Sequence, residues 1–280
     1  MQSNQDTESL CPECLSRISA RRVVYAHEVR LEKYCPRHGH FSAVIWRGNP
    51  RFTDWKRPKL PCSPPVCQTP VETGCPYDCG LCPEHGQHTC TTLLEVTSRC
   101  NLGCPVCFAH SQQKGQDPEL SKLKQDLEYI RNNAGACTLQ ISGGEPTLRD
   151  DLEHIISHAA KQRFSLLQLN SNALRFAREA DYAQKLRDAG LQSVFMQFDA
   201  LQDEAYISLR GKPLLDLKIR ALEVLSEAGL GVVLVPTLIP GINTQDIGKL
   251  VRLGLKYYPT VRGVHFQPIS YFGRYPQTPA

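Results

Sequence analysis

Three closely spaced cysteines, Cys100, Cys104 and Cys107, have the spacing in this 280-residue chain that most clearly predicts chemistry. They directly follow the apolar run at residues 93–96, so a strand is expected to deliver three thiolates to one loop. Three thiolates can hold three irons of a cubane cluster and leave the fourth iron open to a chelating small molecule. The loop therefore predicts a cluster that both carries electrons and binds a ligand.

A second motif, Ser-Gly-Gly-Glu-Pro at residues 142–146, follows the next apolar run at 137–141. Gly143 and Gly144 let the backbone approach a ligand closely, and Glu145 suits an ammonium group. In this order on successive strands, the two motifs resemble the signature of the radical S-adenosylmethionine (SAM) superfamily. The resemblance implies a 4Fe–4S cluster on Cys100, Cys104 and Cys107. It also implies that SAM is bound there and cleaved to a 5'-deoxyadenosyl radical, which abstracts hydrogen from a C–H bond.

From residue 92 onward, apolar runs alternate with amphipathic stretches, as expected for repeated βα units and a parallel sheet. The predicted strands span 93–97, 138–142, 166–170, 194–199, 232–239 and 264–269. The predicted helices span 120–132, 150–161, 175–189, 213–228 and 245–255. The expected fold class is α/β, a partial (β/α)6 TIM-like barrel of the radical SAM type preceded by a small Cys-rich metal-binding region.

Function in such barrels lies at the carboxyl ends of the strands. Polar residues follow several of the expected strands and resemble the family's contacts to the methionine carboxylate and ribose of SAM. With the glycine-rich motif, the implied SAM-binding set is Gly143, Gly144, Glu145, Pro146, Ser171, Asn172, Gln197, Asp199 and Thr237. Taken singly, such polar residues also cap helices or close turns. No side chain is assigned a catalytic role.

The N-terminal segment contains Cys11-x2-Cys14 and Cys35-x2-His38, separated by a stretch that alternates like a short hairpin. This set suits a closed tetrahedral site that folds a domain too small for a core of its own. Zinc or mononuclear iron are the two candidates, and either His38 or Cys62 can supply the fourth ligand.

Cys75, Cys79 and Cys82 repeat the spacing of the first loop, but no strand precedes them. Cys90 lies close enough in sequence to complete four-thiolate ligation, so we expect a closed auxiliary Fe–S cluster. The alternative is a second zinc site that uses His85 or His88. The resulting division is a zinc-ribbon-like or rubredoxin-like domain at 1–60, an auxiliary-cluster segment at 61–91 and a radical SAM core at 92–280.

Thirteen cysteines and a polar start without a signal peptide fit metal ligation in the cytoplasm better than a disulfide framework. No apolar run is long enough to span a bilayer. The net charge is +4, and residues 1–60 hold eleven Lys and Arg against six Asp and Glu. We interpret this excess as a solvated face, and nucleic acid is not an expected partner.

The sequences around the cysteine motifs, together with Phe-Gln-Pro-Ile-Ser at 266–270, resemble the branch that includes tetraether-lipid-synthase-like enzymes and radical SAM methylases of pterins. That resemblance implies methylation or C–C bond formation on a lipid or pterin-like small molecule, with a reductant such as ferredoxin or flavodoxin. Members of the branch continue beyond the sixth strand, so this chain is expected to be truncated. The alternatives are a cofactor-biosynthesis or peptide-modifying radical SAM enzyme, and a non-catalytic metal-binding nucleic-acid module.

Overall fold

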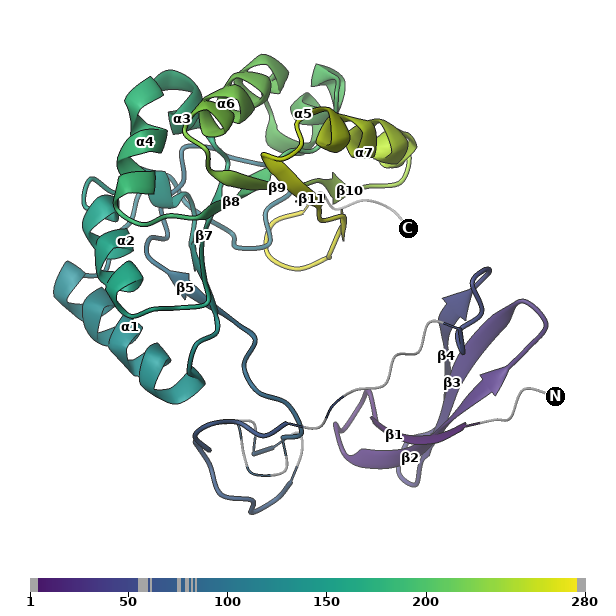
Figure 1. The fold of residues 1–280 in the computed structure, drawn as a ribbon. Helices are drawn as coiled ribbons and strands as arrows, with labels where there is room; N and C mark the ends of the chain where they lie inside the picture. The colour runs from purple at the N-terminus through teal and green to yellow at the C-terminus, as the bar shows by residue number, and fades with distance from the viewer. Residues whose placement is uncertain are drawn as a thin grey trace. The chain divides into compact units, whose positions relative to one another are not determined.

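The computed structural model describes residues 5–54, 60, 62–74, 77–78, 81, 83 and 85–275. The chain forms two compact units, Met1–His88 and Thr89–Ala280 (Figure 1). Each unit has its own sheet, and each is described by itself. The further division of the first unit at residue 60 remains a prediction.

The first unit is built on a four-stranded antiparallel meander with the order β1-β2-β3-β4. Its strands are β1 (Gln5–Leu10), β2 (Arg17–Val24), β3 (Glu28–Cys35) and β4 (Gly39–Arg47). The expected hairpin corresponds to β2 and β3, where Val24 pairs with Val29. The buried apolar residues of this sheet are few, and most cluster around Cys11, Ile18 and Cys35. A core this small predicts that the unit needs further stabilisation.

The second unit contains a six-stranded parallel sheet with the order β11-β9-β8-β7-β6-β5, so strands consecutive in the sheet follow one another along the chain. The strands are β5 (Thr91–Glu95), β6 (Thr138–Ser142), β7 (Leu166–Ser171), β8 (Ser193–Gln197), β9 (Gly231–Val235) and β11 (Val261–Val264). This parallel order confirms the predicted α/β class. The expected fifth strand is interrupted at Pro236, which has no N–H for the ladder, and continues as β10 (Thr237–Leu238) paired with β12 (Gln267–Pro268).

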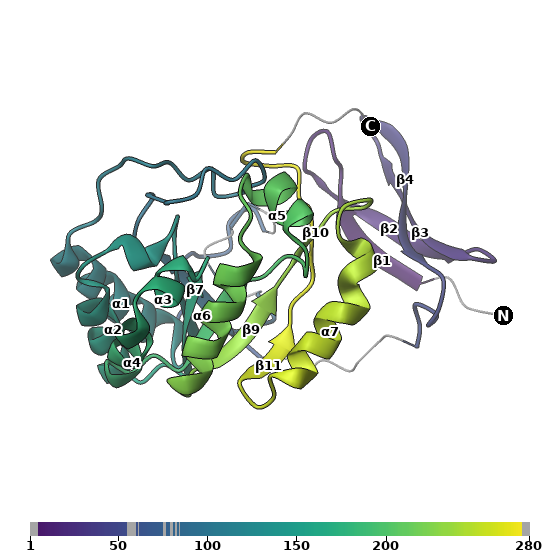
Figure 2. The same cartoon turned by 90° about the horizontal axis from the view of Figure 1, so that it is seen from above.

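Helices cover one face of this sheet (Figures 1 and 2). They are α1 (Leu120–Ala134), α2 (Leu152–Lys161), α3 (Leu174–Arg178), α4 (Ala180–Asp188), α5 (Asp203–Arg210), α6 (Leu215–Glu227) and α7 (Ile247–Lys256). Two short 3-10 helices, η1 (Pro146–Leu148) and η2 (Thr244–Asp246), complete the unit. The single helix expected at 175–189 is divided, because Glu179 between α3 and α4 is extended. Helix α5 was missing from the prediction.

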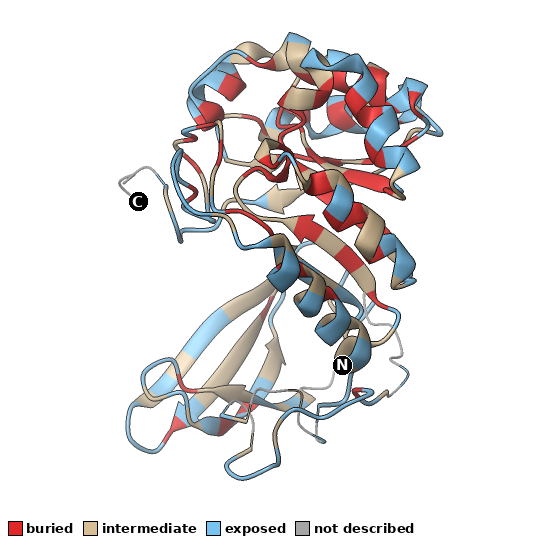
Figure 3. Ribbon diagram, turned by 90° about the vertical axis from the view of Figure 1, so that its left-hand side faces the viewer, coloured by how far each residue is buried: buried red, intermediate tan, exposed pale blue. Residues whose placement is uncertain are grey.

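The faces of the sheet differ in polarity. Leu139, Leu169, Val194 and Leu234 point to the helices and belong to the main hydrophobic core. Residues that alternate with them, such as Gln140 and Gln168, lie on the opposite face and hydrogen-bond across strands at 2.7 Å. Figure 3 shows this alternation of buried and less buried positions along the strands. In the part of the chain that is described, no helix has the length and apolarity to cross a bilayer.

Candidate functional site

The four candidate ligands of the first unit converge at one end of its sheet. Cys11 and Cys14 lie in the β1–β2 connection, whereas Cys35 ends β3 and His38 lies in the turn before β4. Their ligand atoms all lie within 4.8 Å of one another. The sulfurs of Cys14 and Cys35 are 3.9 Å apart, and His38 Nδ1 is 3.5 Å from the Cys11 sulfur. A tetrahedron with metal–sulfur bonds of 2.3 Å has sulfur–sulfur edges of about 3.8 Å, so these residues fit a zinc-sized ion.

The pKa values of the thiols at this site shift in different directions, and burial raises the pKa of Cys11. Hydrogen bonds with the side chain and backbone of Ser16 lower the pKa of Cys14 to about 5. Cys62, the alternative fourth ligand, lies elsewhere in the unit, where its sulfur is 3.1 Å from His88 Nδ1. The geometry therefore groups His38, rather than Cys62, with the three sulfurs.

The expected auxiliary cluster falls largely outside the described residues, which exclude Cys75, Cys79 and Cys82. Cys90 is exposed and belongs to the second unit, where its carbonyl accepts a hydrogen bond of 2.9 Å from Thr138 N–H. The ligand set Cys75, Cys79, Cys82 and Cys90 stays a prediction.

Cys100, Cys104 and Cys107 lie in the loop after β5, at the carboxyl edge of the parallel sheet. Cys100 and Cys104 are buried, and Cys107 is half-buried. Three thiolates on one loop fit a polynuclear cluster that keeps one iron open. Burial raises the pKa of the Cys100 thiol to about 11, so a positive centre must stabilise the thiolate form.

Arg274, near the end of the described chain, holds this cysteine loop. Its backbone N–H donates to Cys107 O at 2.8 Å, and its Nε donates to Cys104 O at 2.7 Å. Cys107 N–H in turn donates to Arg274 O at 2.7 Å. Gly273 is required beside it, because a Cβ there would meet Phe108 O at 2.3 Å. Sequence reasoning missed this clamp, because 170 positions separate Arg274 from Cys104.

A buried ion pair lies behind the cysteine loop. Asp199 follows β8 and is completely buried, and its carboxylate accepts hydrogen bonds of 2.7 and 2.8 Å from Arg210 on α5. Arg210 also donates to Val106 O and to Thr237 Oγ1, both at 3.0 Å. It lies near the Cys104 sulfur and opposes the burial that raises the pKa of that thiol. Asp199 and Thr237, both expected near SAM, are thus tied to the loop through an arginine that the sequence analysis did not single out.

Glu145 connects two strand ends. Its buried carboxylate accepts hydrogen bonds from Thr147 N–H and Oγ, from Ser171 Oγ at 2.8 Å and from Asn172 N–H at 2.7 Å. The Asn172 side-chain amide donates to Asn101 Oδ1 in the cysteine loop, also at 2.8 Å. Glu145 therefore fixes the Gly-Gly-Glu-Pro loop to the end of β7, which is a structural role that the motif alone did not predict. Pro146 is buried and begins η1.

Gly143 and Gly144 meet the backbone that leads into the cysteine loop. A Cβ at Gly143 would lie 2.1 Å from Thr97 O, and one at Gly144 would lie 2.2 Å from Arg99 O. Gly143 also has a φ of +134°, which side-chain-bearing residues rarely adopt. Gly144 N–H donates to Thr97 O at 2.8 Å. Glycine is thus needed here for close packing of the two motif loops.

Lys218 is a further charged group that sequence reasoning missed. It is completely buried on α6, and its ammonium donates to Asn172 O at 2.6 Å and to Gln197 Oε1 at 3.2 Å. Burial lowers its pKa to about 8, although Asp199 opposes that shift. The available signal was a lysine in the apolar stripe formed by Leu215, Leu222 and Leu225.

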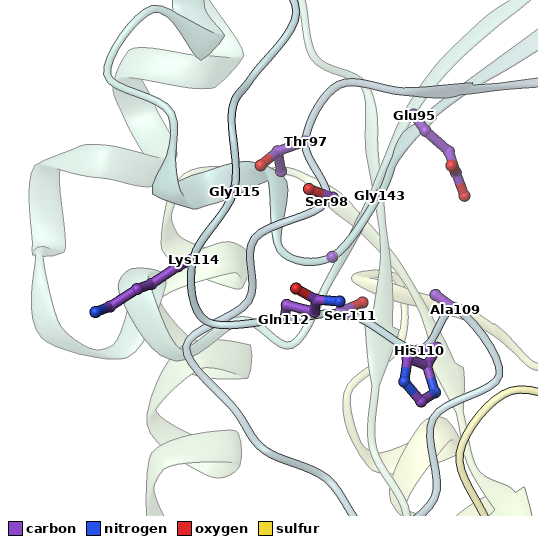
Figure 4. A pocket seen from close by; sticks show the side chains of 11 residues that line it. Glu95, Thr97, Ser98, Ala109, His110, Ser111, Gln112, Lys114, Gly115 and Gly143 are labelled. Carbon is purple, nitrogen blue, oxygen red and sulfur yellow. The ribbon is translucent and has the colours of Figure 1, made fainter.

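A pocket of about 210 Å³ opens where the two motif loops meet (Figure 4). Its wall includes Glu95 at the end of β5, Thr97, and the glycine pair of the second motif. Residues 109–112, which follow the cysteine loop, form another part of it. The structure thus brings the predicted SAM-binding residues Gly143, Gly144, Glu145, Ser171 and Asn172 around one edge of the sheet, with Gln197, Asp199 and Thr237 beside them.

Two family profiles match the chain. Residues 94–254 match the Radical SAM superfamily, and residues 4–47 match the HMPTM N-terminal zinc ribbon domain. The second match covers the four-stranded sheet and its Cys3His group.

Among curated proteins, the chain is 37% identical over 272 residues to 7,8-dihydro-6-hydroxymethylpterin dimethyltransferase of Methanocaldococcus jannaschii, which covers 96% of this chain and 54% of that protein. It is 30% identical over 177 residues to GTP 3',8-cyclase of Nautilia profundicola, covering 62% of this chain and 55% of that protein. The chain therefore spans about half the length of these relatives.

Among solved structures, Streptococcus suis SuiB bound to precursor peptide SuiA has a TM-score of 0.59 at 14% identity, covering 69% of this chain and 43% of that one. Methylornithine synthase (PylB) has a TM-score of 0.53 at 12% identity, covering 68% and 56%. These likenesses agree with the parallel sheet and its covering helices. The profile match over more than half of its length shows that the chain belongs to the radical SAM superfamily.

Proposed function

We propose that this radical SAM chain methylates a reduced pterin. The observation that carries the proposal is the three-cysteine loop, which is fixed at the carboxyl edge of the sheet in a chain 37% identical to a pterin dimethyltransferase. In this proposal Cys100, Cys104 and Cys107 hold three irons of a 4Fe–4S cluster. When bound, the cluster and SAM supply a 5'-deoxyadenosyl radical for C–H activation.

The residues of the chain then have three tasks in this proposal. The backbone of Gly143 and Gly144 and the half-buried side chain of Gln197 orient SAM. The other predicted SAM-binding residues support these groups from within the protein, because most of their polar atoms already form hydrogen bonds there. They are Glu145, Pro146, Ser171, Asn172, Asp199 and Thr237. Arg210 offsets the negative charge of the buried thiolates.

The N-terminal group of Cys11, Cys14, Cys35 and His38 is proposed to bind zinc and to stabilise its sheet, because its spacing fits a closed tetrahedral site. The set Cys75, Cys79, Cys82 and Cys90 is proposed as an auxiliary cluster. A low-potential protein such as ferredoxin or flavodoxin is the proposed electron donor. A cysteine-rich chain with metal sites fits the reducing cytoplasm.

The first test is cleavage of SAM. The anaerobically reconstituted protein is given dithionite and SAM, and 5'-deoxyadenosine is measured by mass spectrometry. We expect 5'-deoxyadenosine from the wild type and from Cys137→Ala, a control outside the cysteine loop. We expect none above background from Cys104→Ala. Equal product from both variants would overturn the assignment of the cluster loop.

The second test is the fate of the methyl group. With methyl-labelled SAM and 6-hydroxymethyl-7,8-dihydropterin, the label is expected in the pterin product. A cyclase such as the GTP 3',8-cyclase relatives or a peptide-modifying enzyme would leave the pterin unlabelled. Cleavage of SAM without labelled pterin would therefore keep the radical SAM assignment and contradict the proposed substrate.

A further inference from the structure

The face of the parallel sheet that lies opposite the helices carries a row of side chains at the carboxyl edge of the sheet. The strand registers place Glu95 beside Ser142, Ser142 beside Asn170, Asn170 beside Phe195, and Phe195 beside Val233. Ser142 and Asn170 continue the β6–β7 register by one residue, because Ile141 pairs with Leu169 and the Asn170 amide reaches Ser142 Oγ. Adjacent strands are about 4.8 Å apart, so the backbones of Glu95 and Asn170 are about 10 Å apart, with Ser142 of β6 between them.

Glu95 is an exposed carboxylate at one end of this row, and it lines the pocket beside Gly143 and Gly144 (Figure 4). Within the described part of the chain, it has no hydrogen bond or ion pair. This contrasts with Glu145 nearby, whose oxygens are fully engaged. Glu95 is therefore available to accept hydrogen bonds from a ligand.

Asn170 supplies a second acceptor. Its side-chain N–H donates to Ser142 Oγ at 3.3 Å, and this hydrogen bond sets the orientation of the amide. Its Oδ1 is shielded from solvent and has no hydrogen-bond partner among the described residues. A buried acceptor without a donor is unfavourable, so an N–H group of a ligand would satisfy the Asn170 oxygen by donating a hydrogen bond to it.

The other half of the row is aromatic and apolar. The Phe195 ring lies 5.2 Å from the ring of His265, with an angle of 58° between their planes. Val233 follows on the next strand. A flat ring with polar N–H groups on one edge would contact the aromatic side with its body and the acceptors with that edge.

Building on the proposed function, we propose that Glu95 determines substrate specificity by accepting the paired N–H groups of a 2-amino-4-oxo-pyrimidine ring, the part that pterins and guanine share. Asn170 Oδ1 accepts a further N–H from the same ligand, and Phe195 contacts its ring. A carboxylate matches two parallel N–H donors in the bidentate geometry that it uses with guanidinium groups. A long alkyl chain offers nothing to either acceptor, so the row favours a heterocycle over a lipid.

The test measures ligand binding rather than turnover. The reconstituted protein with SAM, kept oxidised so that no reaction occurs, is titrated with 6-hydroxymethylpterin, whose fluorescence reports binding. The same titration uses 6-hydroxymethyllumazine, which has an oxygen in place of the 2-amino group. The variants are Glu95→Gln and a control, Glu227→Gln, at an exposed glutamate on α6. Thermal melting shows that each variant is folded.

We expect the wild type and the control to bind the pterin about tenfold to a hundredfold more tightly than the lumazine, the range for a charged hydrogen bond. Glu95→Gln should weaken pterin binding by a similar factor and lose most of that preference. Unchanged binding and preference in Glu95→Gln would overturn this inference while leaving the proposed function intact. Failure of the wild type to bind the pterin at all would contradict both.

Discussion

The two cysteine sites in this chain bring thiol groups together in different ways. In the N-terminal unit four ligands come from two turns of one small sheet and converge within 4.8 Å. In the second unit three cysteines share one loop, which is held by residues from distant parts of the chain. We expect the fold of the first unit to depend on the metal of its site, and the shape of the second site to depend on the fold around it. Closed and open sites need these opposite arrangements.

The largest effect should follow from removing the metal of the first site. Cys35→Ala, or a strong chelator, should unfold the four-stranded sheet, because its apolar core is very small. Both tryptophans, Trp46 and Trp55, lie in residues 1–88, so their fluorescence reports on this unit. The helical circular dichroism signal reports on the second unit and should persist. Loss of both signals together would show that the two units depend on each other for stability.

The next largest effect should come from the buried ion pair behind the cluster loop. Arg210→Met leaves Asp199 as an uncompensated buried charge, which should lower the free energy of unfolding by about 3–5 kcal/mol. Arg220→Met on α6 removes the arginine of a half-exposed pair with Glu223 and should change it by under about 1 kcal/mol. Denaturant unfolding followed by helical circular dichroism measures both. Equal effects would mean that the buried pair contributes no more than a surface pair.

Lys218 should give the second unit a pH-dependent stability. Its pKa of about 8 in the folded chain is below the ordinary value of 10.5, so the unfolded chain binds more protons between these two values. The free energy of unfolding that this residue contributes should therefore rise as the pH increases through that window. Relative to Lys218→Met, the wild type should gain up to roughly 3 kcal/mol between about pH 7 and about pH 10. Parallel pH profiles of the two proteins would contradict this assignment.

Glu145 should show a smaller effect that is specific to the second site. Glu145→Gln replaces one acceptor oxygen by an amide that cannot receive the Asn172 N–H, which should lower the free energy of unfolding by about 1–3 kcal/mol. Glu153→Gln, at an exposed pair with Lys185, is the matched control and should be nearly neutral. Iron content after reconstitution should fall in Glu145→Gln but not in the control. Full iron content with an unchanged unfolding curve would show that the network is dispensable.

The comparison also explains what the sequence predicts and what it cannot. The cysteine spacings, the glycine-rich motif and the apolar runs are local patterns, and the predicted α/β fold with a parallel sheet is confirmed. Helix α5, the division between α3 and α4, and the supports Arg210, Lys218 and Arg274 were missed. Their roles come from contacts between residues far apart in the chain, such as Arg274 with Cys104 and Arg210 with Val106. No local pattern marks an arginine for such a contact.

The glycine pair illustrates the same limit at a residue that was singled out. The sequence indicated that Gly143 and Gly144 allow close approach of the backbone, and the close approach in the structure is to Thr97 and Arg99. The need for glycine followed from the motif, whereas the identity of the group that the glycines approach could be seen only in the folded chain. Contact of these glycines with SAM remains a prediction.

The most direct test of the central claim is whether SAM binds to the cluster held by Cys100, Cys104 and Cys107. The reconstituted, reduced protein is mixed with SAM that carries ¹⁷O in its carboxylate, and electron–nuclear double resonance is recorded. We expect hyperfine coupling between the label and the cluster in the wild type, and no coupling in Cys104→Ala. A wild type that binds both cluster and SAM but shows no coupling would contradict it.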